Sequence, residues 1–366
     1  MQVPFYDIQA QYKDLATELD TVVHDVISTG NYVLGNNNKA FEEEFARLHN
    51  VKHAIAVHSG TDALRIMMDA AGITRGDEVI TTAFTFVASV ETIVQTGATP
   101  VFVDIDPATF MMDPAKIEAA ITSKTKAILP IHLFGQLCDV TRIGEIAKKH
   151  GLVVLEDAAQ AIESSYHGKL AGNFGVSAGF SFYVTKNLGA AGDGGMIVTN
   201  DDETNETCRS IRVHGMGRER YYYDHLGYTA RLDEIQAAVL RVKMTKLGDW
   251  GARKIEIAEK YLAEFAGLEG LVLPVTSEGN NHTYHQFTVK SNKRDALQEH
   301  LKGLGVPSMI YYPVPIHHHK PYLPFAPANP LTVTEQVSHE VLSLPIHPHL
   351  LDEQVEYVID SVKKFF

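Results

Sequence analysis

A lysine and an aspartate in this chain could together act on a carbonyl compound. Lys186 follows the aromatic-rich stretch Phe180–Tyr183 and precedes the small residues Gly189–Gly195. A lysine in such a place can lie partly out of water, which lowers the pKa of its amine and lets the amine attack a carbonyl. Asp157 follows the apolar stretch Leu152–Glu156, where a buried carboxylate is costly unless it meets a cation or a strong donor. A protonated pyridine nitrogen would be such a partner.

Two loops could complete a site around these residues. The loop His58–Asp62 carries small and hydroxyl side chains ahead of a predicted helix, whose first N–H groups would suit a phosphate. The segment Phe84–Phe86 could stack an aromatic side chain on a flat ring. Each feature also has an ordinary interpretation: a surface lysine, a helix-capping aspartate, an N-cap by Ser59 or Thr61, and phenylalanines packed in the core.

Short strands alternate with helices through the first 200 residues. The predicted strands are Ala54–Val57, Glu78–Ile80, Pro100–Asp104, Ala127–Leu133, Leu152–Glu156, Gly179–Tyr183 and Met196–Thr199. The predicted helices between them are Thr61–Ala71, Phe86–Thr96, Pro114–Ala120 and Val140–His150. This alternation predicts an α/β domain with a mostly parallel sheet covered by helices on both faces. Ligands of such sheets collect at the carboxyl ends of the strands.

The pattern changes after Leu232. Helices are predicted at Asp233–Leu247, Ala252–Phe265, Arg294–Leu304, Glu335–Leu342 and Asp352–Phe365, and strands at His285–Val289 and Ser308–Tyr312. We therefore expect a large domain over residues 1–245, N-terminal arm included, and a smaller α+β domain over residues 246–366.

The composition weighs against several classes of function. The formal net charge of −13 opposes general binding to nucleic acid or to anionic lipid. Two cysteines, Cys138 and Cys208, make no disulfide framework and indicate a reducing compartment. The N-terminus lacks the layout of a signal peptide, and no apolar run approaches the ~20 residues that span a bilayer. We expect a cytoplasmic protein without nucleic-acid or membrane partners.

Five segments together resemble one protein family. They are SGTDAL from Ser59, FTFVAS from Phe84, EDAAQA from Glu156, FSFYVTKNLGAAGDGG from Phe180 and GYTARLDEIQAAVL from Gly227. In these the chain is similar to the DegT/DnrJ/EryC1/StrS family of nucleotide-sugar aminotransferases, which depend on pyridoxal 5′-phosphate (PLP). The similarity extends from Val3 to Pro348. It implies the fold-type I architecture of aspartate aminotransferase and a homodimer whose active sites lie at the subunit interface.

The resemblance also assigns roles to single residues. Lys186 would be the Schiff-base lysine, Asp157 the partner of the pyridine nitrogen, and Gln160 a contact on the side of the ring's 3-hydroxyl. Phe86 would stack on the ring. The implied phosphate ligands are Gly60, Thr61, Ser181 and the backbone at Asp62. Thr229 stands where relatives usually carry the asparagine that reaches the partner subunit's PLP phosphate, and its shorter hydroxyl puts this contact in question.

The reaction implied is amino-group transfer from glutamate to a keto-sugar nucleotide, with Lys186 as general base and acid. The segments Thr185–Gly195 and Arg212–Gly215 resemble members that act at the sugar 3-position, which favours a dTDP-3-keto-6-deoxyhexose as acceptor. The same chemistry at C4, or on a UDP-keto-sugar, is the alternative. Candidate substrate contacts are Tyr183, Arg218, Tyr221 and His317.

Other classes of function fit the sequence less well. The glycine run Gly189–Gly195 suggests a nicotinamide-dependent oxidoreductase, but it follows a lysine motif instead of opening an N-terminal βαβ unit. The related PLP dehydratases carry histidine where Lys186 stands. A regulator that uses the same fold is opposed by the acidic charge and by the lack of a helix-turn-helix segment.

Three adjacent histidines, His317–His319, suggest a metal site. Neighbouring residues of an extended chain point in alternating directions, so we expect these side chains to lie in a substrate pocket or at the surface and to bind no metal.

Overall fold

Seven strands form the central sheet of the computed structural model, which describes residues 1–366. In chain order they are β1 (His53–Val57), β2 (Glu78–Thr82), β3 (Thr99–Val103), β4 (Thr125–Ile128), β5 (Val153–Asp157), β8 (Ser177–Ser181) and β9 (Gly195–Thr199). Their order across the sheet is β1-β9-β8-β5-β4-β2-β3, and only β9 runs antiparallel to its neighbours. The predicted α/β fold with a mostly parallel sheet is confirmed.

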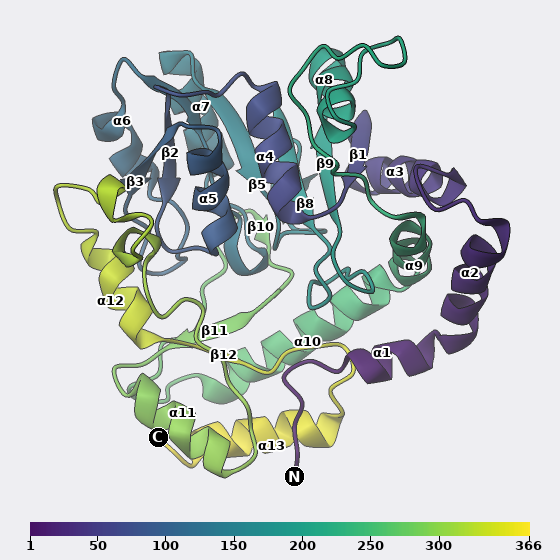
Figure 1. Cartoon of the computed structure of the whole chain (residues 1–366). Coiled ribbons are helices and arrows are strands. Elements are labelled where there is room, and N and C mark those ends of the chain that lie inside the picture. Colours follow the sequence, from purple (N-terminus) through teal and green to yellow (C-terminus); the bar gives the residue numbers. More distant parts are fainter.

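Helices cover both faces of this sheet, because its strands carry apolar side chains on both faces. Ile55 and Val57 of β1 face one helical layer, whereas Ala54 and Ala56 face the other. The first layer holds α4 (Gly60–Ala70), α5 (Val87–Gln95) and α8 (Asp202–Arg212). The second holds α3 (Asn36–His49), α7 (Val140–His150) and α9 (Glu234–Met244). Figure 1 shows α4 and α5 in front of the sheet.

The C-terminal part has a hydrophobic core of its own. It is built from α10 (Leu247–Phe265), β11 (Phe287–Lys290), α11 (Arg294–Gly303), β12 (Val341–Leu344) and α13 (Asp352–Lys363). Val3 of the N-terminal arm packs into this core, and its N–H donates to the Gly305 carbonyl. The arm therefore contacts the C-terminal unit, and the proposed boundary after residue 245 stays a prediction.

Shorter elements complete the chain. They are α1 (Ile8–Asp14), α2 (Ala16–Thr29), α6 (Ile117–Ala120), α12 (Thr332–Glu340) and a small sheet of β6 (Ser165–Tyr166), β7 (Lys169–Leu170) and β10 (Asn280–Asn281). No helix is both long and apolar enough to cross a membrane.

Three sequence predictions of elements were wrong. Residues 308–312 form no strand, since Met309 makes only an isolated bridge to Ser343. The helix predicted to end at Leu342 ends at Glu340, because Val341–Leu344 pairs with β11 as a strand. The strand predicted to run to Leu133 ends at Ile128, beyond which the chain turns into the loop that lines the site.

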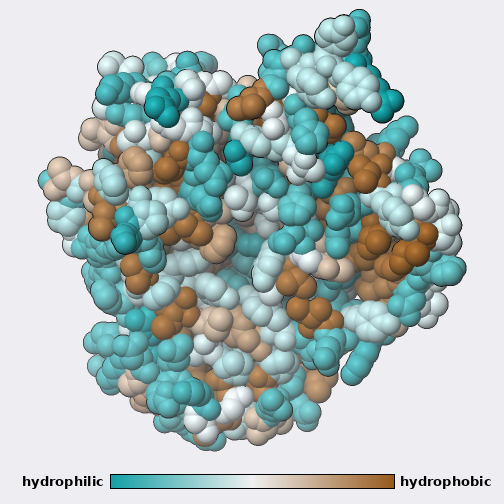
Figure 2. Space-filling view, viewed as in Figure 1, coloured by the Kyte–Doolittle hydropathy of each residue, from teal (hydrophilic) through white to brown (hydrophobic).

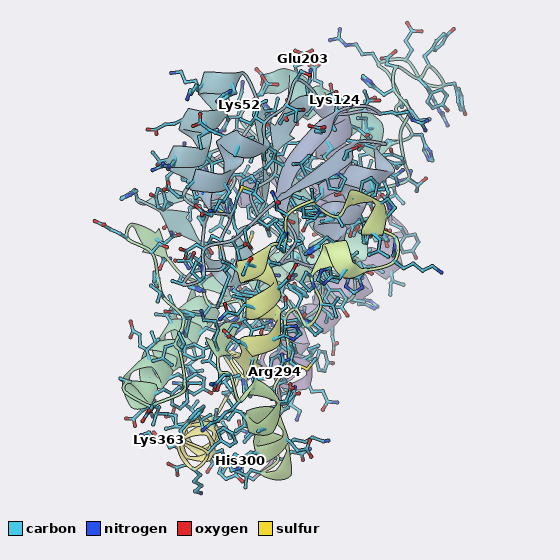
Figure 3. All side chains as sticks on the ribbon, turned by 90° about the vertical axis from the view of Figure 1, so that its left-hand side faces the viewer. Lys52, Lys124, Glu203, Arg294, His300 and Lys363 are labelled. Atoms are coloured by element: carbon cyan, nitrogen blue, oxygen red, sulfur yellow. The ribbon has the colours of Figure 1, made fainter.

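The carboxyl ends of the parallel strands point toward the C-terminal unit. Lys52 and Lys124, which directly precede β1 and β4, lie at the far end of the molecule in Figure 3. Arg294 and His300 of α11 lie at the opposite end. The carboxyl ends therefore lie in the middle of the molecule, where ligands of such sheets bind.

Candidate active site

A cavity of about 490 Å³ lies at the carboxyl ends of the strands. Its wall combines the β1–α4 loop, the end of β5, the turn after β8 and a segment of the C-terminal unit. Eight of the residues singled out from the sequence line it: Gly60, Thr61, Phe86, Asp157, Gln160, Ser181, Tyr183 and Lys186.

Lys186 stands in the turn that follows β8, where its N–H donates to the Tyr183 carbonyl at 2.8 Å. Burial lowers the pKa of its amine to about 8, although the nearby Asp157 carboxylate acts in the opposite direction. At pH 8 about half of these amines are therefore neutral, whereas an ordinary lysine is almost fully charged. A neutral amine facing a cavity is a nucleophile and a proton acceptor.

Two further lysines hold this turn in place. Lys254 Nζ donates to Asn187 Oδ1 at 2.7 Å, and Lys243 Nζ donates to the Gly189 carbonyl at 2.7 Å. Both amines are buried, and burial lowers the pKa of Lys254 to about 7 and that of Lys243 to about 8. Because each bond reaches a residue just after Lys186, the pair limits the positions that the Lys186 side chain can take.

Asp157 ends β5 with its carboxylate buried in the cavity wall. Its Oδ2 accepts from Ser89 Oγ at 2.6 Å, and its Oδ1 accepts from the Ala159 N–H at 3.1 Å. Burial raises the pKa of this carboxyl, and the two bonds and Lys186 only partly offset the effect. Its hydrogen-bond partners are neutral, so the carboxylate can still gain from a cation in the cavity.

Glu156 shows why β5 can carry two acidic residues in a row. Successive side chains of a strand point to opposite faces, so Glu156 turns away from the cavity. It accepts from His132 Nε2 at 3.0 Å and from the N–H groups of Gly172, Phe174 and Gly175 at 2.7–2.9 Å. Although burial opposes ionisation, these donors keep the pKa of Glu156 below its ordinary value. Glu156 therefore holds the loop Gly172–Gly175 in place, whereas the Asp157 carboxylate lies in the wall of the cavity.

The start of α4 forms a narrow cradle beside β8. Ser59 caps the helix and accepts from the Asp62 N–H at 3.0 Å. A side chain at Gly60 would put its Cβ 2.6 Å from the Cβ of Ser181, so only glycine fits there. The close approach leaves the first N–H groups of α4 facing the cavity, which suits a phosphate.

The other two predicted ring contacts also lie in the wall. The Gln160 amide is oriented at both ends: Oε1 accepts from the Phe134 N–H at 2.8 Å, and Nε2 donates to the Tyr312 hydroxyl at 3.1 Å. Phe86, at the start of α5, leaves 55% of its surface exposed, with its ring centroid 6.5 Å from that of Tyr312. An exposed aromatic side chain in a cavity wall is free to stack on a flat ring.

Comparisons with known proteins identify the family of this chain. The model of the DegT/DnrJ/EryC1/StrS aminotransferase family matches residues 13–363. The chain belongs to this family. Two relatives match it over 100% of its length: a Geobacillus stearothermophilus protein named pleiotropic regulatory protein (47% identical, 99% of that protein) and the Streptomyces venezuelae dTDP-3-amino-3,4,6-trideoxy-α-D-glucose transaminase (42% identical, 96%). The crystal structure of DesV from S. venezuelae has a TM-score of 0.97 at 42% identity, with 100% of this chain and 98% of that chain covered.

The aminotransferase uses pyridoxal phosphate as its cofactor, and the residues present fit that group. The Asp157 carboxylate lacks a hydrogen-bonded cation, and the cradle at Gly60 and Ser181 leaves helical N–H groups open. One glycine of the run Gly189–Gly195, which suggested a nicotinamide enzyme, is required by a close backbone contact. A side chain at Gly195 would come within 2.3 Å of the Ser59 carbonyl, so glycine lets β9 pass close to the cradle.

Five predicted residues lie outside the cavity of the aminotransferase chain. The Asp62 N–H is already used by Ser59, so it does not add to the cradle. His317 is buried against Phe102, because Ile316–His318 forms a 3₁₀ turn that carries it away from the cavity. Arg218 and Tyr221 belong to the loop of residues 213–228, which follows α8 and projects beyond it (Figure 1); this loop is called the excursion below. Tyr221 is 70% exposed. Thr229 is exposed and lies 2.9 Å from His214 Nε2.

Several residues of the aminotransferase cavity were missed in the sequence. They are Tyr6, Thr85, Ser89, His132, His285, Gln286, Tyr311 and Tyr312. Ser89 lies three residues after Phe86 in the quoted segment FTFVAS, so its place could have been found by asking which donor reaches Asp157. Tyr6 accepts from Gln286 Nε2 at 2.7 Å across 280 residues of chain, a contact for which the local sequence holds no signal.

Proposed function

We propose that this aminotransferase moves the amino group of glutamate to C3 of a dTDP-3-keto-6-deoxyhexose and so forms a dTDP-3-amino-3,6-dideoxyhexose. The observation that carries the proposal is the pairing of Lys186 and Asp157 in one cavity beside the cradle at Gly60. PLP supplies an electron-accepting ring and a carbonyl for the exchange of amino groups.

Each residue has a distinct task in this proposal. Asp157 keeps the pyridine nitrogen protonated, Gln160 directs its amide at the 3-hydroxyl side, and Phe86 covers a ring face. Gly60, Thr61 and Ser181 hold the phosphate. Lys186 anchors the cofactor, and its free amine then carries the proton from the α-carbon of glutamate and returns one to the sugar carbon that gains nitrogen.

The rest of the cavity is suited to a polar substrate. Tyr6, Tyr183, Gln286 and Tyr311 offer hydroxyl and amide groups along the wall. Side chains of this kind can hydrogen-bond the hydroxyls of a sugar without adding charge. A nucleotide diphosphate also needs cationic side chains to bind its phosphates. Arg218, the cationic residue predicted for this contact, does not line the cavity of its own chain.

A second copy of the chain could supply these contacts, and we include a homodimer in the proposal. Apolar side chains gather on the right of Figure 2, in the region of α2 and α3, where Ile27, Tyr32 and Val33 are each about half exposed. The excursion that carries Arg218 and Tyr221 is also exposed to solvent in the single chain. In a homodimer, Thr229 and this excursion would face the partner's cavity.

The choice of sugar rests on the names of relatives. At 40% identity, an Aneurinibacillus thermoaerophilus relative is named dTDP-3-amino-3,6-dideoxy-α-D-galactopyranose transaminase. At 42%, an Acidithiobacillus ferrooxidans relative is named as a 3-aminotransferase of a UDP-N-acetyl-3-dehydroglucosamine. Both names place the amino group at C3 of the sugar, which supports amination at C3. The two relatives differ in the nucleotide, so their names leave dTDP and UDP sugars as competing acceptors.

A substrate panel tests the proposal. The enzyme would be incubated with [¹⁵N]glutamate and four acceptors, the 3-keto and 4-keto forms of a dTDP-6-deoxyhexose and of a UDP-N-acetylhexosamine. We expect kcat/KM for the dTDP-3-keto sugar to exceed that for each other acceptor at least about tenfold, or 1.4 kcal/mol, with ¹⁵N on C3 by NMR. Preferred amination at C4, or of a UDP sugar, would overturn the choice of substrate.

A further inference from the structure

Three potential metal ligands meet outside the catalytic cavity. His317 and His318 lie in the 3₁₀ turn Ile316–His318, and Glu335 lies in the first turn of α12. The alternation expected for an extended chain does not hold in this tight turn, so both imidazoles face Glu335. The ligating atoms of the three side chains all lie within 4.8 Å of one another.

The two distances from the carboxylate to the imidazoles match edges of a coordination tetrahedron. His317 Nε2 and His318 Nε2 lie 3.5 and 3.6 Å from the same carboxylate oxygen, Glu335 Oε1. Zinc binds histidine nitrogen and carboxylate oxygen at about 2.0–2.2 Å, so two tetrahedral ligands lie about 3.3–3.6 Å apart. Both distances exceed the 2.7–3.2 Å of an ordinary N–H···O bond. These long contacts leave room for an ion between the two imidazoles and the carboxylate.

The burial of His317 gives an independent reason to expect a ligand. Only 3% of this residue is exposed, and its Nδ1 has no hydrogen-bond partner. Its Nε2 lies 3.5 Å from Glu335 Oε1. The Nε2 atom is therefore held only by a long contact to a carboxylate, and a metal ion between Nε2 and Glu335 would replace that contact with a short bond. The side chain of His318 is 47% exposed, which leaves a path for an ion from solvent.

We propose that His317, His318 and Glu335 bind one Zn²⁺ ion, with water as the fourth ligand. Two imidazoles and one carboxylate suit zinc, whereas magnesium and calcium prefer oxygen ligands throughout. The site is separate from the catalytic cavity, since none of its three residues lines that cavity.

A zinc ion here would join two segments that lie behind the cavity wall, the histidine turn and the start of α12. The Ile316 N–H donates to the Ala83 carbonyl at 3.0 Å, so the histidine turn already holds the loop that leads to Phe86. Asp104, just after β3, accepts from the N–H groups of Val333 and Thr334 at 2.9 Å and so fixes the start of α12. The ion would lock the histidine turn to α12 and thereby stiffen the support of the Phe86 loop.

Zinc titration of tag-free, PLP-loaded protein tests the proposal. The protein is first stripped with EDTA, and zinc is then added against a chromophoric chelator while the melting temperature is followed. We expect one tight Zn²⁺ per chain and a rise in melting temperature for the wild type. His318→Leu and Glu335→Gln should each weaken binding at least about a hundredfold and abolish the rise, because each removes one of three ligands.

His319→Leu is the matched control, since this exposed neighbour is not a member of the cluster and its variant should bind zinc as the wild type does. Both ligand variants change side chains with exposed atoms, so they should fold. X-ray absorption at the zinc edge should show two imidazoles in the wild type. Equal zinc binding by the wild type and His318→Leu, or none by the wild type, would overturn the proposal.

Discussion

Replacing Lys186 with alanine should lower kcat for sugar amination by at least about 10³-fold. The change removes both the amine that anchors the cofactor and the group that carries the proton. The effect should be chemical and not structural, because the burial that lowers the pKa of Lys186 to about 8 is a cost to folding that alanine lacks. Circular dichroism and the melting temperature of the variant should therefore match or exceed those of the wild type.

Two variants make this result specific. Lys124→Ala removes an exposed lysine at the far end of the sheet (Figure 3) and should leave kcat unchanged. Lys186→Arg keeps a positive charge but no usable nucleophile, so it should be as inactive as Lys186→Ala. Substantial turnover by either Lys186 variant would mean that another group carries the proton.

Asp157→Asn should have the second largest effect, a loss of about 10²–10³-fold in kcat. An amide cannot keep the pyridine nitrogen protonated, so the ring would accept electrons less well. Ser89→Ala removes the 2.6 Å bond to Asp157 and the bond to Thr85 but keeps the carboxylate, so it should cost about tenfold or less. Equal losses in the two variants would indicate that Asp157 acts through position and not through charge.

Asp157→Asn should also raise the melting temperature of the enzyme when the cofactor has been removed. Burial raises the pKa of Asp157 in the folded state, so ionisation favours unfolding once the pH exceeds the unfolded pKa of about 3.9. The asparagine avoids this cost, and the Ser89 hydroxyl can accept from it while donating to Thr85 Oγ1 at 2.9 Å. We expect the variant to melt about 1–3 °C higher near pH 7, with the difference vanishing below pH 4. A variant that melts lower than the wild type at both pH values would contradict this account.

Local signals in the sequence were enough for most of the large domain. Val140–His150 was predicted with both ends correct, because an amphipathic stretch ends at Gly151 in the left-handed conformation. The helix wrongly predicted to reach Leu342 has another cause. Val341 and Leu342 continue a helical pattern, but pairing with β11 makes them a strand. Such pairing joins residues 51 to 57 positions apart, so propensity within the segment could not reveal it.

The residues of the site also fall into those that local sequence signals predicted and those that depend on long-range packing. Lys186, Asp157 and Ser181 follow strands of the sheet, so the rule for carboxyl ends brought them together from the sequence. Tyr6, His285 and Tyr312 reach the cavity from the arm and from the C-terminal unit, and their approach depends on how the two units pack. His317 was misplaced for a local reason, because the tight turn Ile316–His318 was treated as extended chain.

The most direct test of the account is to find where the cofactor is attached. Lys186 is not the only lysine with a perturbed amine, since burial lowers the pKa of Lys254 to about 7. Lys254 donates to Asn187 Oδ1 and does not line the cavity, so it should not react. Borohydride reduction of the PLP-loaded enzyme, followed by peptide mass mapping, should place the cofactor on Lys186 alone and bleach the visible absorption band. Labelling of Lys254, or no label on any lysine, would contradict the central claim.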